Sequence, residues 1–221
     1  RRQRQMCIRD STYPNIINFE AVFGMEEMKW SSIQKDMMEY DVTMPYIRMM
    51  AGPVDYTPGA MRNASKKDFK DIYYNPMSQG TRCHQLAAYV VHDSPLTMLA
   101  DNPTIYKREQ ECTDFIISIP NKGIEETRVL QGKVGESIIM ARRAGTSWYI
   151  GGMTDWTARE ITLDFDFLDN GNYEVILFKD GINADKQAED YKQEQFTITP
   201  ASKKKIRMAS GGGFAMTITK K

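Results

Sequence analysis

Two glutamates, Glu20 and Glu26, lie close together near the start of the sequence, after a short apolar run. Glu20 follows the run IINF, Gly24 interrupts the chain, and Glu26 stands two residues later in a stretch of charged and apolar residues. In a parallel α/β barrel the active site is built at the C-terminal ends of the strands, from the loops that lead into helices. Paired carboxylates at that place can do acid–base work at a glycosidic bond or bind a hard cation.

A structural explanation competes with the catalytic one. Acidic residues in the first turn of a helix are stabilised by the helix macrodipole, and Glu26 is followed by a second glutamate, Glu27. Spacing alone leaves both explanations open. Asp55, in GPVDYTPG, ends the second apolar run, so the same barrel argument predicts that it faces the pocket. The structural alternative is that the side chain of Asp55 forms an Asx-turn before Pro58.

The predicted secondary structure that must position these residues changes once along the chain, from mixed strands and helices to strands alone. Up to Pro120 the pattern predicts a helix over 25–40, a buried strand running into a loop over 42–59, and helices over 81–93 and 100–119. Strands that alternate with helices indicate parallel strands joined by crossover connections. We therefore expect an α/β segment.

After Pro120 the sequence consists of short strand-like segments at regular spacing, separated by turn signals such as DNGN and SGGG. In ITLDFDFL the alternation is strict, and it places Ile161, Leu163, Phe165 and Phe167 on one face of a strand. This pattern is typical of an antiparallel β-sandwich. The predicted fold class is α/β plus all-β.

The first residues, RRQRQMCIRDS, resemble the translation of a transposase adaptor used to tag DNA for sequencing. We expect residues 1–11 to be an artefact and the natural sequence to begin near Thr12, within a longer protein. A basic nucleic-acid-binding arm is the alternative, but Lys and Arg together number 29, as do Asp and Glu. That balance provides no electrostatic footprint for nucleic acid. Cys83 and Cys112 are too few for a zinc site and read as two buried thiols or one bridge.

Several long stretches closely resemble glycoside hydrolase family 97. They are TYPNIINFEAVFGMEE, YDVTMPYIRMMAGPVDYTPGAM, NPMSQGTRCHQLAAYVVHDSPLTMLADNP, VLQGKVGESIIMARR and WYIGGMTDWTAR. The resemblance implies calcium-dependent α-glucosidases and α-galactosidases, largely periplasmic, with a β-supersandwich, a (β/α)₈ barrel and a C-terminal sandwich linked to oligomerisation. Residues 12–120 then form the C-terminal part of the barrel, and residues 121–221 form the sandwich.

By the same resemblance, Glu20 is a calcium ligand and Glu26 is the general acid, whereas Glu27 matches no family position. The family carries a further catalytic carboxylate and more calcium ligands upstream, so retention or inversion stays open. The implied activity is exo-acting hydrolysis of terminal α-linked sugars in an oligo- or disaccharide, with an α-glucosidase expected ahead of an α-galactosidase. We expect this chain alone to be inactive. The alternative function is a non-catalytic β-sandwich module for binding or homo-oligomerisation.

Overall fold

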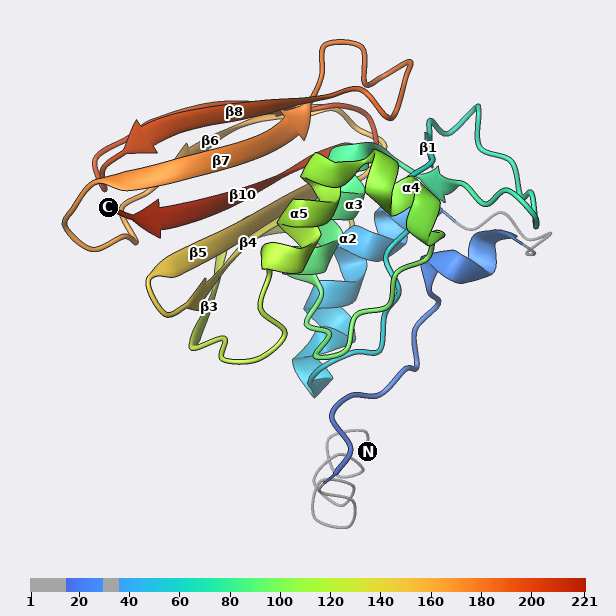
Figure 1. Ribbon diagram of the computed structural model, residues 1–221, viewed down its shortest axis with the longest axis horizontal. Helices are drawn as coiled ribbons and strands as arrows, with labels where there is room; N and C mark the ends of the chain where they lie inside the picture. The colour runs from blue at the N-terminus through green and yellow to red at the C-terminus, as the bar shows by residue number, and fades with distance from the viewer. Residues whose placement is uncertain (1–14, 30–35) are drawn as a thin grey trace.

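The computed structural model describes residues 15–29 and 36–221, so the adaptor-like segment lies outside the described residues. Its centre is a six-stranded antiparallel sheet, faced on one side by a two-stranded sheet and on the other by helices (Figure 1). In order across the large sheet the strands are β3 (Glu126–Lys133), β4 (Ser137–Ala144), β5 (Ser147–Thr154), β10 (Gly213–Lys220), β7 (Tyr173–Asp180) and β8 (Tyr191–Ile198). The small sheet pairs β6 (Arg159–Asp164) with β9 (Lys203–Met208).

The space between the two sheets is filled by the apolar faces of their strands. Leu163 and Phe165 are 1% and 0% exposed, whereas Thr162 and Asp164 point to solvent, as the strict alternation predicts. Each fully buried side chain of this size contributes roughly 1.5–3 kcal/mol. The prediction of an antiparallel β-sandwich after Pro120 is confirmed.

The opposite face of the large sheet is covered mainly by helix α3 (Arg82–Val91), which contacts β5 and β10. Glycines on these strands permit a close approach. A Cβ at Gly151 would lie 2.7 Å from the carbonyl oxygen of Ala87, and one at Gly213 would lie 2.9 Å from the Cα of His84. Side chains at these two positions would push the helix off the sheet. The helix predicted over 81–93 is confirmed.

The segment predicted as a helix over 100–119 forms two helices, α4 (Pro103–Arg108) and α5 (Gln110–Ser118). Cys112 on α5 and Cys83 on α3 are both buried and form no disulfide. Of the two alternatives, the structure therefore has two free thiols. No helix in the described ranges combines the length and the apolar character needed to cross a membrane.

The prediction of a buried strand that runs into a loop over 42–59 is wrong, because residues 42–47 belong to helix α2 (Met37–Ile47). Asp36 caps this helix by accepting a hydrogen bond from the backbone N–H of Glu39. Pro45 lies inside α2 and cannot donate to the carbonyl of Asp41. The Nε2 of His92 takes that place, 3.2 Å from the same carbonyl oxygen.

The helix predicted over 25–40 is also only partly correct. Its first part is a short 3₁₀ helix, η1 (Met25–Lys29), its last part begins α2, and Trp30 lies in the gap outside the described residues. A second 3₁₀ turn, η2 (Met49–Ala51), follows α2.

Parallel pairing within the described residues is confined to short pieces. Strands β1 (Asn63–Ala64) and β2 (Ser78–Gln79) pair in parallel, and Phe19 forms an isolated parallel bridge with Val54. These pieces agree in direction with the parallel strands expected upstream of Pro120. They do not make a barrel in this chain, and the domain division at residues 120 and 121 stays a prediction.

Candidate active site

Two segments distant in sequence meet where Phe19 pairs with Val54. The N–H of Asp55 donates to the carbonyl oxygen of Phe19 at 2.9 Å. Because the bridge is parallel, the residues that follow each segment leave from the same edge. Glu20 and Asp55 are therefore neighbours, and both side chains are exposed.

The side chain of Arg48, just beyond α2, holds this edge together. Its Nη2 atom lies 3.0 Å from the carbonyl oxygen of Glu20, and its Nη1 atom lies 3.2 Å from the carbonyl oxygen of Gly52. It also donates to the carbonyl of Phe19. A guanidinium offers five donors in a fixed plane, so one side chain can fix two backbone segments in register.

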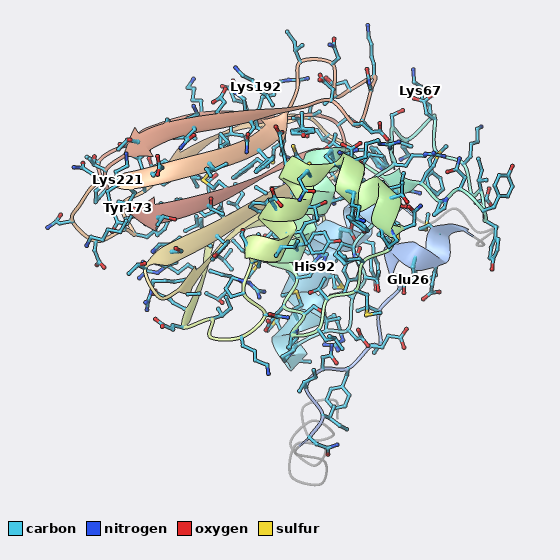
Figure 2. The ribbon with its side chains drawn as sticks, viewed as in Figure 1. Glu26, Lys67, His92, Tyr173, Lys192 and Lys221 are labelled. Atoms are coloured by element: carbon cyan, nitrogen blue, oxygen red, sulfur yellow. The ribbon has the colours of Figure 1, made fainter. Side chains whose placement is uncertain are left out.

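Helix η1 brings Glu26 to the same region. The N–H of Met25 donates to the carbonyl oxygen of Thr57 at 3.0 Å, which joins the start of η1 to the segment that follows Asp55. The N–H of Phe23 donates to the hydroxyl of Tyr40 at 2.8 Å. Figure 2 shows Glu26 on η1 at the margin of the molecule, away from the β-sheets. The structure thus gathers Glu20, Glu26 and Asp55 around one strand edge.

The carboxyl group of Glu26 differs from the two exposed ones. It is half-buried, and its Oε2 atom is buried without a hydrogen-bond partner among the described residues. Burial raises the pKa of Glu26 above its ordinary value, and the neighbouring carboxylates of Glu27 and Glu20 raise it further. Hydrogen bonds from its own backbone and from Thr57 lower the pKa, but burial is the largest effect. A carboxyl group in this setting keeps its proton to a higher pH, as a general acid must.

A buried polar chain lies behind this edge. Tyr56, between Asp55 and Thr57, donates its hydroxyl to Oδ1 of Asp41 at 2.7 Å. The other oxygen of Asp41 lies 3.3 Å from Nε2 of His84, and Nδ1 of His84 lies 3.2 Å from the carbonyl oxygen of Gly212. Since a carbonyl only accepts, Nδ1 of His84 carries a hydrogen. The chain connects the candidate site to the turn before β10.

The residues described do not form a complete calcium site by themselves. No group of three or more histidine, cysteine, aspartate or glutamate side chains within residues 15–29 and 36–221 is arranged to hold a metal ion. Calcium takes six to eight oxygen ligands. The exposed carboxylate of Glu20 could supply one of these oxygens, and its role as a calcium ligand stays a prediction.

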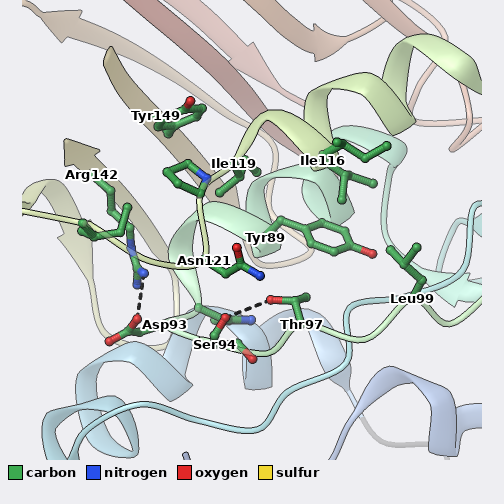
Figure 3. Close-up of a pocket in the computed structure, with 14 residues that line it drawn as sticks. Tyr89, Asp93, Ser94, Thr97, Leu99, Ile116, Ile119, Asn121, Arg142 and Tyr149 are labelled. Carbon is green, nitrogen blue, oxygen red and sulfur yellow. Dashed lines mark hydrogen bonds and ion pairs between the residues drawn. The ribbon is translucent and has the colours of Figure 1, made fainter. Parts of the chain in front are cut away.

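A separate cavity of about 230 Å³ lies where the helices meet the sheet (Figure 3). Tyr89, Ile116, Asn121 and Tyr149 are among its lining residues, and Arg142 pairs with Asp93 at its edge, 3.0 Å apart. Glu20, Glu26 and Asp55 do not line it. The carboxylates, rather than this cavity, therefore define the candidate site.

Sequence reasoning missed the residues that organise the site. Gly24, Tyr40, Arg48 and Thr57 act through contacts with residues far away in the chain or through the absence of a side chain. Two local signals were visible: Gly24 interrupts the chain between the two glutamates, and the stretch DYTPG places Thr57 two residues after Asp55. The roles assigned to Glu20, Glu26 and Asp55 remain predictions.

Comparisons with known proteins agree in one family. A family model described as "Glycosyl-hydrolase 97 C-terminal, oligomerisation" matches residues 123–219. A protein of Bacteroides thetaiotaomicron described as a retaining alpha-galactosidase is 55% identical over 207 residues, covering 94% of this chain and 31% of that protein. A probable retaining alpha-galactosidase of Streptomyces bingchenggensis is 26% identical over 170 residues, covering 77% of this chain and 24% of that protein.

A solved structure extends the likeness to the fold. A family 97 enzyme from Pseudoalteromonas sp. strain K8, in complex with acarbose, superposes with a TM-score of 0.84 and 32% identity, over 96% of this chain and 33% of that one. This chain therefore spans about a third of the length of these two more similar relatives.

Proposed function

Since this chain belongs to glycoside hydrolase family 97, we propose that it is part of an exo-acting α-glycoside hydrolase that removes terminal α-linked sugars. The observation that carries the proposal is the half-buried carboxyl of Glu26, with its raised pKa, beside the exposed carboxylates of Glu20 and Asp55. We assign Glu26 as the general acid that protonates the departing oxygen, and Asp55 as a residue that contacts the sugar.

Within this class we favour an α-galactosidase over the α-glucosidase expected from the sequence. The support is the 55% identical relative, which is described as a retaining alpha-galactosidase. A retaining mechanism requires a second carboxyl group about 5–5.5 Å from the acid, acting as nucleophile. Glu26 then serves as the acid in the first step and as the base for water in the second. We place calcium, with Glu20 as one ligand, and a periplasmic location in the same proposal, on the family resemblance.

The test uses the complete enzyme and two substrates that differ in leaving group. A sugar alkoxide needs a proton to depart, whereas a nitrophenolate hardly does. Glu26→Gln should lower kcat/KM for an α-linked disaccharide by about 10²–10⁴-fold, and it should spare the chemical step with a nitrophenyl α-glycoside much more. The alkaline limb of the disaccharide pH profile should flatten, because a glutamine has no proton to lose.

Glu27→Gln is the matched control, since Glu27 is adjacent, equally half-buried and in the same turn of η1. It should leave kcat/KM for both substrates within about threefold of the unchanged enzyme. The alkaline limb should move slightly to lower pH, because the Glu27 carboxylate helps to raise the pKa of Glu26. Equal losses on both substrates for Glu26→Gln, or a larger loss for Glu27→Gln, would mean that the acid is another residue.

A second function belongs to the sandwich. The family model that matches residues 123–219 carries oligomerisation in its description. We propose that the sandwich assembles copies of the complete protein, and analytical ultracentrifugation over a range of protein concentrations tests this directly. A monomer at every concentration would exclude it.

A further inference from the structure

The carboxyl group of Glu26 folds back over the backbone of Gly24. A Cβ placed on Gly24 would lie 2.1 Å from Oε2 of Glu26 and 2.6 Å from both Oε1 and Cδ. Real Cβ atoms do not approach other heavy atoms this closely, so a side chain at position 24 and the present position of the carboxyl exclude each other. The backbone at Gly24 does not adopt the left-handed region, so conformational freedom does not explain why a glycine stands here.

The backbone around Gly24 is held on both sides. Phe23 donates its N–H to the hydroxyl of Tyr40, and Met25 donates its N–H to the carbonyl of Thr57. The side chains of Met25 and Met28 are 3% and 1% exposed in a core cluster that includes residues of α2. A backbone shift at Gly24 would break these hydrogen bonds or this packing. The carboxyl at the free end of the Glu26 side chain moves far more easily.

We infer that Gly24 is a positioning residue for the general acid: the missing side chain leaves the space in which the Glu26 carboxyl is held against the backbone. This inference rests on the proposed function of Glu26. In that space Oε2 is shielded from water and has no hydrogen-bond partner among the described residues. A larger residue at position 24 would turn the carboxyl out of this space, away from the place where it meets the departing oxygen.

The test is Gly24→Ala in the complete enzyme, compared on a disaccharide and on a nitrophenyl α-glycoside. Displacing the acid should lower kcat/KM for the disaccharide by about tenfold or more, within the range that general acid help provides. The value of kcat/KM for the nitrophenyl substrate should stay within about twofold, because it reports the first step, in which this leaving group hardly needs a proton. The value of kcat also includes the second step, in which Glu26 acts as the base for both substrates. The melting temperature should change by no more than a few degrees, because the strain is relieved by a side-chain rotation.

Gly181→Ala is the matched control. A Cβ at Gly181 would also meet a carboxyl group, at 2.3 Å from Oδ2 of Asp190, but it lies in the sandwich next to β7. This variant creates the same kind of clash and should leave the ratio of the two activities unchanged.

A double-mutant cycle separates the inference from the proposed function. In Glu26→Gln, the further change Gly24→Ala should have almost no effect on disaccharide turnover, because Gly24 acts only through the lost acid. If Glu26→Gln shows no preference between leaving groups, the proposed function fails. If Glu26→Gln shows the preference between leaving groups and Gly24→Ala does not, only the role of Gly24 is overturned. A Gly24→Ala protein that does not fold would overturn it too, since the backbone rather than the carboxyl would then have to yield.

Discussion

At the scale of single residues, the candidate site separates its carboxyl groups by environment. Glu20 and Asp55 are exposed at the ends of paired segments, where a charged carboxylate is well solvated. Glu26 is half-buried with one oxygen unpartnered, and its pKa is raised by burial. Carboxyl groups held in different environments can take different roles within one site.

Glu20 leads to a prediction about calcium in the complete enzyme. A hard cation binds through several charged oxygens, so replacing one carboxylate with an amide weakens the site. Glu20→Gln should lower calcium affinity by roughly tenfold or more, measured by calorimetry. Glu27→Gln should leave the affinity unchanged. Equal affinities for Glu20→Gln and the unchanged enzyme would remove Glu20 from the ligand set.

The carboxylates of the site were predictable from the sequence, and their supports were not. Glu20 and Asp55 stand where apolar runs end, and Glu26 stands at the start of the charged stretch after Gly24, patterns visible along single stretches of chain. Arg48 bonds to carbonyls at residues 19 and 20, and Tyr40 bonds to the N–H of Phe23. Such partners depend on tertiary packing between segments, which one sequence does not show.

At the scale of elements, helix α3 is joined to the sandwich by a buried carboxylate. Asp180, the last residue of β7, accepts hydrogen bonds from the hydroxyl of Thr81 at 2.6 Å and from the N–H groups of Ala209 and Gly213 at 2.8 and 2.9 Å. Thr81 is also the N-cap of α3. Burial nonetheless raises the pKa of Asp180 to about 6.

This pKa predicts a pH-dependent stability. Because the pKa is raised in the folded state, the contribution of Asp180 is fully present below its ordinary value of 3.8 and is lost as the pH rises through about 6. Two pKa units correspond to about 3 kcal/mol. The free energy of unfolding of Asp180→Asn, relative to the unchanged chain, should therefore improve by up to about this amount between pH 4 and pH 7.5.

Urea denaturation of Asp180→Asn and of the unchanged chain at each pH measures the difference between their free energies of unfolding. His92 has the opposite dependence, since burial lowers its pKa to about 4 and its contribution is lost as the pH falls through that value. Both proteins contain His92, so its effect cancels in the comparison. Asp164→Asn, on the exposed face of β6 where the carboxylate pairs with Lys203 at 2.9 Å, is the control for the loss of an exposed carboxylate. A difference between Asp180→Asn and the unchanged chain that stays constant with pH would contradict the prediction.

Elements after Pro120 were predictable because short segments of strand length are separated by turn signals at regular spacing, with strict alternation in ITLDFDFL. Helix α2 was not, because an apolar run such as VTMPYI fits a buried helix or a buried strand equally well. Proline is unfavourable inside a helix, and the structure accommodates Pro45 because His92 takes the freed carbonyl of Asp41. That compensation comes from 51 residues further along the chain, so no local rule reveals it.

At the scale of the whole molecule, the large sheet takes part in two apolar cores, one inside the sandwich and one beneath the helices. The large sheet buries one face against β6 and β9 and the other against helices, with α3 resting on Gly151 and Gly213 (Figure 1). Ile138, Met140 and Met153 on β4 and β5 pack against Ala87 and other residues of the helices. The sandwich therefore depends on α3 as well as on its own strands.

Residues 121–221 produced alone should accordingly be much less stable than the full chain. Removing the helices exposes the apolar face formed by Ile138, Met140, Met153 and Phe178, and exposed apolar patches of this kind promote association. We expect a lower midpoint of urea unfolding, stronger binding of a hydrophobic dye and concentration-dependent aggregation. A chain of residues 81–221, which restores α3, α4 and α5, should recover most of the stability and lose the dye binding, because α3 supplies the main contacts with β5 and β10. Equal unfolding midpoints for 121–221 and the full chain would show that the sandwich folds independently and that α3 only rests on it.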